Sequence, residues 1–262
     1  MDTPHTPTRV AIVTGGARGI GLAIGQWFLA DGWNVALLDN NADTLFPAVQ
    51  ALQQPSRVLA VHADVSMPDQ VTKAVAEVDQ RFGRIDALVN NAGVAVFKRI
   101  GLTTFEEWRY VMATNLDGPF LCSQAVVPVM LRGADGRKGG AVVNIASISG
   151  LRASTMRVAY GTSKAAIIHL TKQQAIEYGN AGIRVNAVAP GPVETEMAKQ
   201  VHDETIRRDY FDAIPLRRYG TVDEIASAVG YLCSPAAAYV NGQTLAVDGG
   251  LSTSHPVVRR KK

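Results

Sequence analysis

Tyr160 and Lys164 form a pair of side chains whose types and spacing could carry out proton transfer. They lie in the segment Tyr-Gly-Thr-Ser-Lys, at the beginning of a helical pattern that reaches about Tyr178. Side chains four residues apart share one face of a helix. A tyrosine, whose pKa is ordinarily about 10, acts as a base near neutral pH only if its phenolate is stabilised, and a neighbouring ammonium group does this. The pair therefore indicates acid–base chemistry, although this spacing also arises by chance.

Two polar residues upstream fit the same chemistry. Ser147 ends the apolar segment Asn144–Ser147, so its hydroxyl group is expected at the carboxyl edge of a sheet, within reach of Tyr160. Asn115 lies within a helical pattern, where asparagine is a poor helix former. The alternatives are a turn cap for Ser147 and a polar helix face for Asn115.

A glycine-rich turn follows the first apolar run. Residues 14–21 read Thr-Gly-Gly-Ala-Arg-Gly-Ile-Gly and lead directly into a helical pattern over Leu22–Ala30. Glycines in such a turn let a pyrophosphate approach the free N–H groups and the positive end of the helix dipole. The turn therefore predicts a nucleotide site. Its expected contacts are Gly15, Arg18, Gly19, Ile20 and Gly21.

Asp39 and Arg18 bear on which nucleotide is bound. Asp39 ends the second apolar run, 20 residues after Gly19, where a carboxylate accepts hydrogen bonds from the adenosine ribose. Its charge would repel the 2′-phosphate of NADP, and Asn40 and Asn41 supply no cation. A guanidinium at Arg18 would instead favour that phosphate. We weigh Asp39 above Arg18, so NAD is favoured and NADP stays possible.

Two further segments end predicted strands. Asp64-Val65 follows the third run and could meet the adenine edge, while Asn90-Asn91-Ala92-Gly93 follows the fourth. Ligands bind at the carboxyl edge of open parallel sheets, so Asp64, Val65, Asn91, Ala92 and Gly93 are candidate cofactor contacts. A tight turn is the competing interpretation of both segments.

The elements that must position these residues are predicted from hydrophobic periodicity. Seven short runs are apolar on successive residues, as in strands covered on both faces: Val10–Val13, Val35–Leu38, Val58–Val61, Ala87–Val89, Ala141–Ile145, Val185–Val188 and Thr244–Val247. Helical patterns alternate with them. We therefore predict an α/β protein with a doubly wound, seven-stranded parallel sheet of the Rossmann type, flanked by helices on both faces.

Helix starts are predicted where an N-cap oxygen precedes a carboxylate by three residues. The three candidate pairs are Ser66 with Asp69, Thr103 with Glu106, and Thr221 with Glu224.

Composition and charge exclude several classes of protein. The formal charge is +3, but four of the 26 basic residues end the chain, which leaves 22 basic and 23 acidic residues in 1–258. That distribution argues against a nucleic-acid-binding face. Two cysteines make no disulfide framework or metal site, and there is no signal segment or membrane span, so we expect a cytoplasmic protein. We expect one domain over 9–251, between a tail at 1–8 and a basic tail at 252–262.

Taken together, these motifs resemble the short-chain dehydrogenase/reductase family over almost the whole chain, from about Arg9 to Leu251. Pro190-Gly191, Asn241-Gly242-Gln243 and residues 247–250 also match its pattern. The resemblance implies a hydride transfer between NAD(P) and a secondary alcohol or ketone, with Tyr160 exchanging the proton and without a metal. It further implies roles for Lys164, Ser147 and Asn115: Lys164 lowers the tyrosine pKa and holds the nicotinamide ribose, Ser147 orients the substrate oxygen, and Asn115 holds a relay water.

The same resemblance implies the remaining parts of the site. Pro190, Gly191, Val193 and Thr195 would bind the nicotinamide carboxamide. Residues 194–219 would form the substrate lid, with short helices near Glu196–Val201 and Glu204–Phe211, and a new helix would begin near Val222. Candidate substrate contacts are Ser147, Ser149, Met156 and Met197, with Val94 and Leu151 as further pocket walls. Arg152, Arg157 and His202 are candidate anion contacts.

Three functions stay open at this point. The first is an NAD-dependent dehydrogenase of a secondary alcohol, polyol, sugar or hydroxysteroid. The resemblance also implies a homotetramer, since members of the family are usually tetramers. The second is an NADP-dependent 3-oxoacyl-[acyl-carrier-protein] reductase, for which Arg18 is the main support. The third is a nucleotide sensor without chemistry, against which the complete Asn115, Ser147, Tyr160 and Lys164 set argues.

Overall fold

A seven-stranded parallel sheet forms the middle layer of the protein. The structure is a computed structural model that describes residues 8–133, 139–196 and 203–253. The strands are β1 (Val10–Thr14), β2 (Asn34–Asp39), β3 (Val58–His62), β4 (Ala87–Asn90), β5 (Gly140–Ile145), β6 (Ile183–Pro190) and β7 (Thr244–Val247). Their order is β3-β2-β1-β4-β5-β6-β7. All seven predicted strands are confirmed, with ends that differ by at most two residues.

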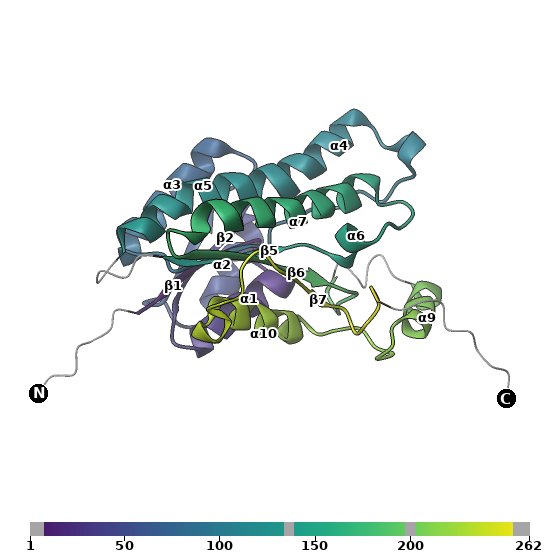
Figure 1. Cartoon of the computed structure of the whole chain (residues 1–262). Coiled ribbons are helices and arrows are strands. Elements are labelled where there is room, and N and C mark those ends of the chain that lie inside the picture. The colour runs from purple at the N-terminus through teal and green to yellow at the C-terminus, as the bar shows by residue number, and fades with distance from the viewer. Residues whose placement is uncertain (1–7, 134–138, 197–202, 254–262) are drawn as a thin grey trace, which may run out of the picture.

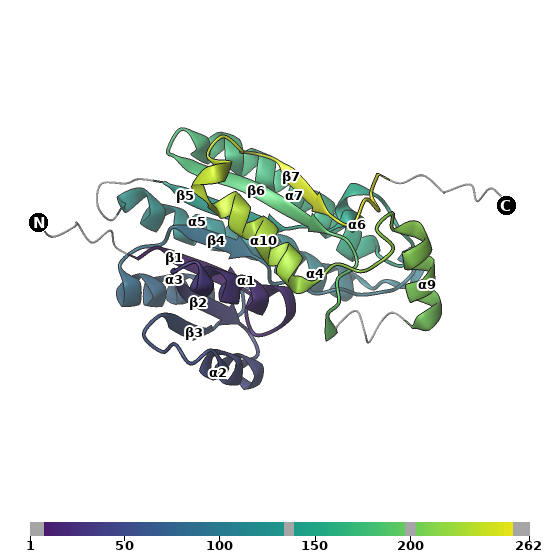
Figure 2. The ribbon, with the colours of Figure 1, turned by 90° about the horizontal axis from the view of Figure 1, so that it is seen from below.

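Helices cover both faces of the sheet (Figures 1 and 2). One face carries α1 (Gly19–Ala30), α2 (Ala42–Ala51) and α10 (Val222–Cys233). The other carries α3 (Pro68–Phe82), α5 (Gly118–Arg132) and α7 (Val158–Gly179). Alternate residues of β1 serve the two layers, since Val13 packs in the first core cluster and Ile12 in the second. This two-sided burial is the reason that the strands are apolar on successive residues.

Shorter helices lie around the carboxyl edge of the sheet. They are α4 (Phe105–Met112), α6 (Ile148–Leu151) and α9 (Glu204–Ala213), together with the turn η1 (Ile100–Leu102) and the π-helical segment η2 (Ala113–Asp117). The turn η4 (Pro235–Ala237) follows α10 and lies instead at the amino edge of the sheet. The predicted lid helix over 204–211 is thus confirmed as α9. Most of the predicted lid helix over 196–201 and His202 lie outside the described residues.

The register of the sheet brings the polar strand ends to one edge. Val13 pairs with Val89, Asn90 with Asn144, and Ile145 with Val188. The strand order reverses between β1 and β4, and such a reversal opens a crevice for ligands at the carboxyl ends of the strands. The glycine turn, residues 90–93 and Ser147 therefore meet at the same place.

The three predicted helix starts have different outcomes. Thr221 and Glu224 form the predicted capping box of α10. The box predicted at Thr103 is wrong by one residue: Thr104 and Glu107 form it, while Thr103 Oγ1 donates to the Arg99 carbonyl.

The third predicted helix start, at Ser66, is also wrong. Helix α3 begins at Pro68 with Met67 at its N-cap, and Ser66 Oγ donates to Asp64 Oδ1 at 2.7 Å. Proline is preorganised for the first helical position, and the nearby carboxylate competes for the serine hydroxyl group.

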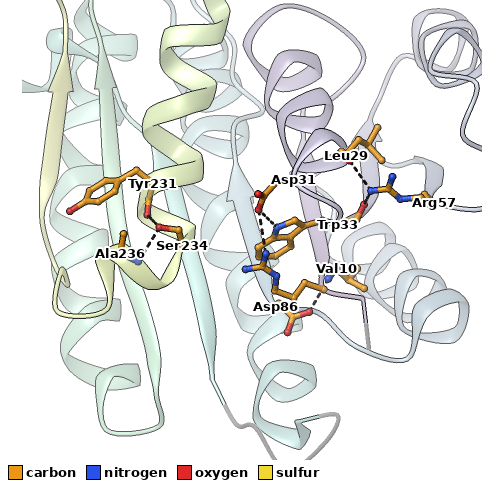
Figure 3. A network of polar contacts seen from close by, with 10 residues as sticks. Val10, Leu29, Asp31, Trp33, Arg57, Asp86, Tyr231, Ser234 and Ala236 are labelled. Atoms are coloured by element: carbon orange, nitrogen blue, oxygen red, sulfur yellow. Dashed lines mark hydrogen bonds and ion pairs between the residues drawn. The ribbon is translucent and has the colours of Figure 1, made fainter. Parts of the chain in front are cut away.

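Polar contacts fasten the amino edge of the sheet, opposite the crevice (Figure 3). Asp86 Oδ2 accepts from the Val10 N–H at 2.8 Å, which joins the approach to β4 to the start of β1. Arg57 donates to the carbonyls of Leu29 and Trp33, both at 2.7 Å. These bonds satisfy main-chain groups at strand and helix ends that would otherwise lose partners on burial.

The two cysteines of the chain serve as apolar filling. Cys122 on α5 and Cys233 on α10 are both buried, and neither forms a disulfide. Burial raises the pKa of each thiol to about 12. Both therefore remain protonated at neutral pH. Among the residues that the structure describes, no helix is long and apolar enough to cross a membrane.

The contact between α1 and α10 leaves no space at Gly230. A Cβ atom there would lie 2.3 Å from Cζ2 of Trp27. We predict that Gly230→Ala lowers the free energy of unfolding by about 1–3 kcal/mol through overpacking, measured by thermal unfolding. Gly101→Ala is the matched control, because a Cβ at Gly101 meets no atom within 4 Å. Equal melting temperatures for the two variants would contradict this packing.

Candidate active site

The glycine turn leaves no room for side chains where the chain meets α1. Gly15 and Gly19 have φ values of +63° and +56°, which L residues with side chains rarely adopt. A Cβ on Gly21 would lie 2.0 Å from the Gly15 carbonyl oxygen. Arg18 occupies the N-cap of α1, and no side chain caps that helix start. The first N–H groups of α1 are therefore available to an anionic ligand.

The segment after β4 is locked to this turn. Thr14 Oγ1 accepts from the N–H groups of Asn91 and Ala92, both at 3.0 Å. Asn91 Nδ2 donates to the Thr14 and Gly15 carbonyls at 2.9 and 3.0 Å. The structure thus brings together the two segments that the sequence assigned separately to the cofactor.

The side chain of Asp39 forms hydrogen bonds at the glycine turn, whereas the side chain of Arg18 forms none in the described structure. Asp39 Oδ2 accepts from the Ala17 N–H at 3.1 Å, and its Oδ1 accepts from the Asn41 N–H at 3.0 Å. Arg18 is exposed. The carboxylate is therefore held at the turn, which is where an adenosine ribose is expected in this fold.

Asp64 and Val65 have more local roles in the described structure. Asp64 Oδ1 accepts from the N–H and hydroxyl groups of Ser66. Val65 is buried against Gly118, where an added Cβ would lie 2.8 Å from Val65 Cγ2. They hold the approach to α3 at the edge of the crevice, and their assignment to the adenine stays a prediction.

Lys164 and Tyr160 lie on one face of α7, as their spacing predicts. Lys164 is 5% exposed, and its Nζ donates to the Ile145 carbonyl at 2.7 Å. The same Nζ lies 5.8 Å from the centre of the Tyr160 ring. Burial lowers the pKa of Lys164 to about 8. A cation held beside a phenol in a water-poor site is the arrangement that stabilises a phenolate.

Ser147 joins Tyr160 across the crevice. It caps α6 at the end of β5, and its Oγ accepts from the Ser149 N–H at 3.1 Å. Burial raises the pKa of Tyr160, while a side-chain hydrogen bond with Ser147 and the charge of Arg157 oppose this rise. The hydroxyl groups of Ser147 and Tyr160 therefore lie close together, and a substrate oxygen could form hydrogen bonds with both.

Asn115 holds the wall of the crevice. Its Oδ1 accepts from the Val94 N–H at 2.8 Å, and its Nδ2 donates to the Val94 carbonyl at 2.9 Å. Nδ2 also donates to Ser163 Oγ at 3.0 Å, and Ser163 Oγ in turn donates to the Tyr160 carbonyl at 2.7 Å. The side chain of Asn115 is thus fully used, which explains a buried asparagine in the π-helical segment η2.

Ser163 and a buried polar network were missed from the sequence. Asn90 Nδ2 donates to Asn144 Oδ1 at 2.8 Å, and Asn144 Nδ2 donates to Thr171 Oγ1 at 2.9 Å. These bonds tie β4, β5 and α7 together beneath the site. Asparagines inside apolar strands are the signal that could have identified the network, because buried amides need partners.

The segment after β6 closes the site from the other side. Gly191 donates its N–H to the Val247 carbonyl at 3.0 Å, and Val193 forms a bridge with Gly220. A Cβ on Gly19 would lie 3.9 Å from Thr195 Cγ2, so Thr195 lies beside the glycine turn. Both ends of the segment 194–219 are therefore held in place beside the site.

The predicted substrate contacts have different outcomes. Ser149 lies beside Ser147, Met156 is exposed, and Met197 lies outside the described residues.

A nicotinamide dinucleotide fits the residues present. The turn offers uncapped N–H groups, and Gly93 is exposed between the turn and the catalytic candidates. A Cβ on Gly93 would lie 3.3 Å from Asn115 Oδ1 and 3.5 Å from Lys164 Nζ. The space between the glycine turn and the catalytic candidates is thus open because glycines without side chains line it.

Comparisons with known proteins agree with this geometry. A family model described as enoyl-(acyl carrier protein) reductase matches residues 15–252. A 2-(R)-hydroxypropyl-CoM dehydrogenase of Xanthobacter autotrophicus is 44% identical over 249 residues, which cover 92% of this chain and 98% of that protein. A 3-oxoacyl-[acyl-carrier-protein] reductase of Synechocystis is 38% identical over 93% of this chain and 96% of its own length.

A solved structure shows the same fold. The gluconate 5-dehydrogenase of Burkholderia cenocepacia, in complex with NADP and tartrate, is 33% identical with a TM-score of 0.88, over 95% of this chain and 97% of that one. The chain belongs to the short-chain dehydrogenase/reductase family. It is an oxidoreductase that acts on alcohol or ketone groups with a nicotinamide cofactor.

The buried charge of Lys164 predicts a pH-dependent stability difference. Between its folded pKa of about 8 and its ordinary value of 10.5, the unfolded chain binds more protons at this residue, so folding stability rises with pH. We predict that the cofactor-free wild type gains melting temperature relative to Lys164→Met as the pH rises through this window.

Lys172→Met on the same helix is the control, because Lys172 is exposed. The difference between wild type and this control is expected to stay constant with pH. Parallel melting curves for wild type and Lys164→Met across the same range would contradict the burial of the charge.

Proposed function

We propose that the protein interconverts a secondary alcohol and a ketone, with Tyr160 as the general acid and base. The observation that carries this proposal is the convergence of Tyr160, Ser147 and buried Lys164 at the carboxyl edge of β5. The bound nicotinamide dinucleotide supplies or accepts the hydride. The chain itself must orient the substrate oxygen and move one proton.

Each catalytic candidate has a separate task in this proposal. The Tyr160 hydroxyl group gives its proton to the ketone oxygen in reduction and takes it from the alcohol in oxidation. Ser147 hydrogen-bonds the same oxygen and fixes its position. Lys164 stays largely protonated at pH 7, since its pKa is about 8, and favours the phenolate of Tyr160.

The proposed proton relay needs a modification of the role given to Asn115. Its amide is occupied by Val94 and Ser163. A relay water at Asn115 would therefore bind its main-chain carbonyl group, with the amide holding η2 and the crevice wall in place. This keeps the water close to Gly93 and Lys164, which lie on the same side of the crevice.

We propose NAD as the preferred cofactor. The support is the Asp39 carboxylate, which is held at the glycine turn by the Ala17 N–H, where it would accept from ribose hydroxyl groups and repel a 2′-phosphate. A second candidate is an NADP-dependent 3-oxoacyl-[acyl-carrier-protein] reductase, as in the Synechocystis relative. Arg18, exposed beside the turn, favours that candidate.

We also propose a homotetramer. Large apolar side chains are exposed on the outer surface of the α5 and α7 layer, notably Phe120 at 49% and Ile176 at 79%. Exposed apolar groups of this size on adjacent helices are typical of a surface that another subunit covers.

The role of Tyr160 can be tested by removing its hydroxyl group. We predict that Tyr160→Phe lowers kcat by about 100- to 10,000-fold, because the general acid and base is lost while the ring is kept. The affinity for NADH, measured by fluorescence titration, is expected to stay nearly unchanged. Wild-type turnover in this variant would overturn the assignment of Tyr160.

The preference for NAD over NADP is expected to depend on Asp39. We predict that Asp39→Ala raises the ratio of kcat/KM for NADP to that for NAD by about tenfold or more, since a charged hydrogen-bond acceptor and a repulsive charge are both removed. Asp43→Ala, which removes the same charge from the first turn of α2, is the control and should leave the ratio nearly unchanged. A wild type that prefers NADP would show that Arg18 dominates.

A further inference from the structure

The two segments that border Tyr160 carry charge of one sign. Residues 91–103 and 146–165 contain Lys98, Arg99, Arg152, Arg157 and Lys164 but no aspartate or glutamate. The rest of the chain up to residue 258 is close to neutral or acidic, since 1–258 together sum to −1. A main-chain bridge between Lys98 and Arg157 joins the two segments at the side of the crevice. These two segments therefore carry a net charge of +5 of their own, of which the charge of Lys98 is paired with Glu107.

Most of these cations already have a partner. Lys98 pairs with Glu107, and Lys164 donates to the Ile145 carbonyl. Arg152 Nη1 donates to the Leu251 carbonyl at 2.8 Å, which ties α6 to the end of the described chain. Within the described ranges, the Arg157 guanidinium forms no ion pair and no hydrogen bond. Arg99 is likewise without an ion pair or a side-chain hydrogen bond in the described residues, but it is exposed, whereas Arg157 is half-buried.

Arg157 is nevertheless held in a defined place. Its guanidinium lies over the Phe97 ring, 4.9 Å from the ring centre, and the residue is half-buried. Stacking uses the face of the guanidinium and leaves its N–H groups, which lie in the plane, free to bind an anion. A preorganised guanidinium without an acid partner matches carboxylate, sulfonate and phosphate groups, which it binds through two hydrogen bonds.

The position of Arg157 relates it directly to the reacting oxygen. It is the N-cap residue of α7, three residues before Tyr160. Burial raises the pKa of the Tyr160 hydroxyl group, and the charge of Arg157 opposes this rise. An anionic group bound by Arg157 would therefore lie at the same end of α7 as the oxygen that faces Tyr160.

We propose that Arg157 determines substrate specificity by binding an anionic group of the alcohol or ketone. The enzyme thus prefers small secondary alcohols and ketones that carry a carboxylate, sulfonate or phosphate a few bonds from the reacting carbon. This inference rests on the proposed function. Arg157 acts by binding the substrate, and Tyr160 still moves the proton.

The test compares substrates that differ only in charge. The probes are 4-oxopentanoate and its methyl ester, with 3-oxobutane-1-sulfonate and 3-oxobutyl phosphate to distinguish the kinds of anion. Reduction is followed by NADH oxidation, and the quantity compared is the ratio of kcat/KM for 4-oxopentanoate to that for the ester. We expect this ratio to exceed one in the wild type and to fall about 10- to 100-fold in Arg157→Gln, chiefly through KM.

Two further variants separate binding from structure. Arg157→Lys keeps the charge but not the two-point geometry, so it should recover part of the ratio. Lys172→Gln removes one positive charge from an exposed position on α7 and should leave the ratio at the wild-type value. A purely structural role of Arg157, or an effect on the Tyr160 pKa alone, would lower both rates equally and leave the ratio unchanged, and this result would overturn the inference.

A binding measurement keeps this inference distinguishable from the proposed function. Pentanoate lacks the ketone, and its affinity for the enzyme saturated with NAD is measured by calorimetry. We expect Arg157→Gln to weaken this binding by the same factor of about 10 to 100. Equal binding by wild type and variant overturns the role of Arg157, whereas weakened binding without turnover of any ketone would overturn only the proposed function.

Discussion

The buried ammonium group of Lys164 is the constraint around which the catalytic edge is built. A cation that is 5% exposed has lost most of its water, and it has one main-chain acceptor, the Ile145 carbonyl. That acceptor belongs to the last residue of β5, where Ile145 pairs with Val188 of β6. A Cβ on Gly93 would lie in contact with Nζ, at 3.5 Å, and Asn115 fixes the adjacent wall through Val94. Three features thus position the Lys164 ammonium group: the sheet register, the π-helical segment η2 and the glycine after β4. Because this cation is poorly solvated, it favours a phenolate beside it.

The fold could be predicted from the sequence because its signals are strong and local. Seven apolar runs gave seven strands, and the spacing of Tyr160 and Lys164 placed them on one helical face. The errors arose where two local signals compete. Ser66 has a capping pattern, but Pro68 and Asp64 decide its conformation. Thr103 and Thr104 both precede a glutamate by three residues, and nothing local says which one caps the helix.

The contacts between distant segments could not be predicted from local pattern. The bond between Thr14 and Asn91 spans 77 residues, and the pairing of Asn115 with Val94 spans 21. These contacts depend on the order of the strands and on the exact depth of each strand end. The stacking of Arg157 on Phe97 is of the same kind. Relatives named for a CoM derivative, an acyl-carrier-protein substrate and gluconate each match more than nine tenths of this chain, so the sequence features common to them do not distinguish these substrates.

The two buried thiols have a practical consequence for site-specific labelling of the protein. Cys122 and Cys233 are the only cysteines in the chain, and burial raises the pKa of both to about 12. Because the thiolate is the reactive form, both cysteines react slowly with alkylating reagents while the fold is intact. A single cysteine introduced on an exposed position of α9 would carry a fluorophore or spin label selectively, without prior removal of the native residues. The wild-type sequence can therefore serve as the background for site-specific labels near the crevice.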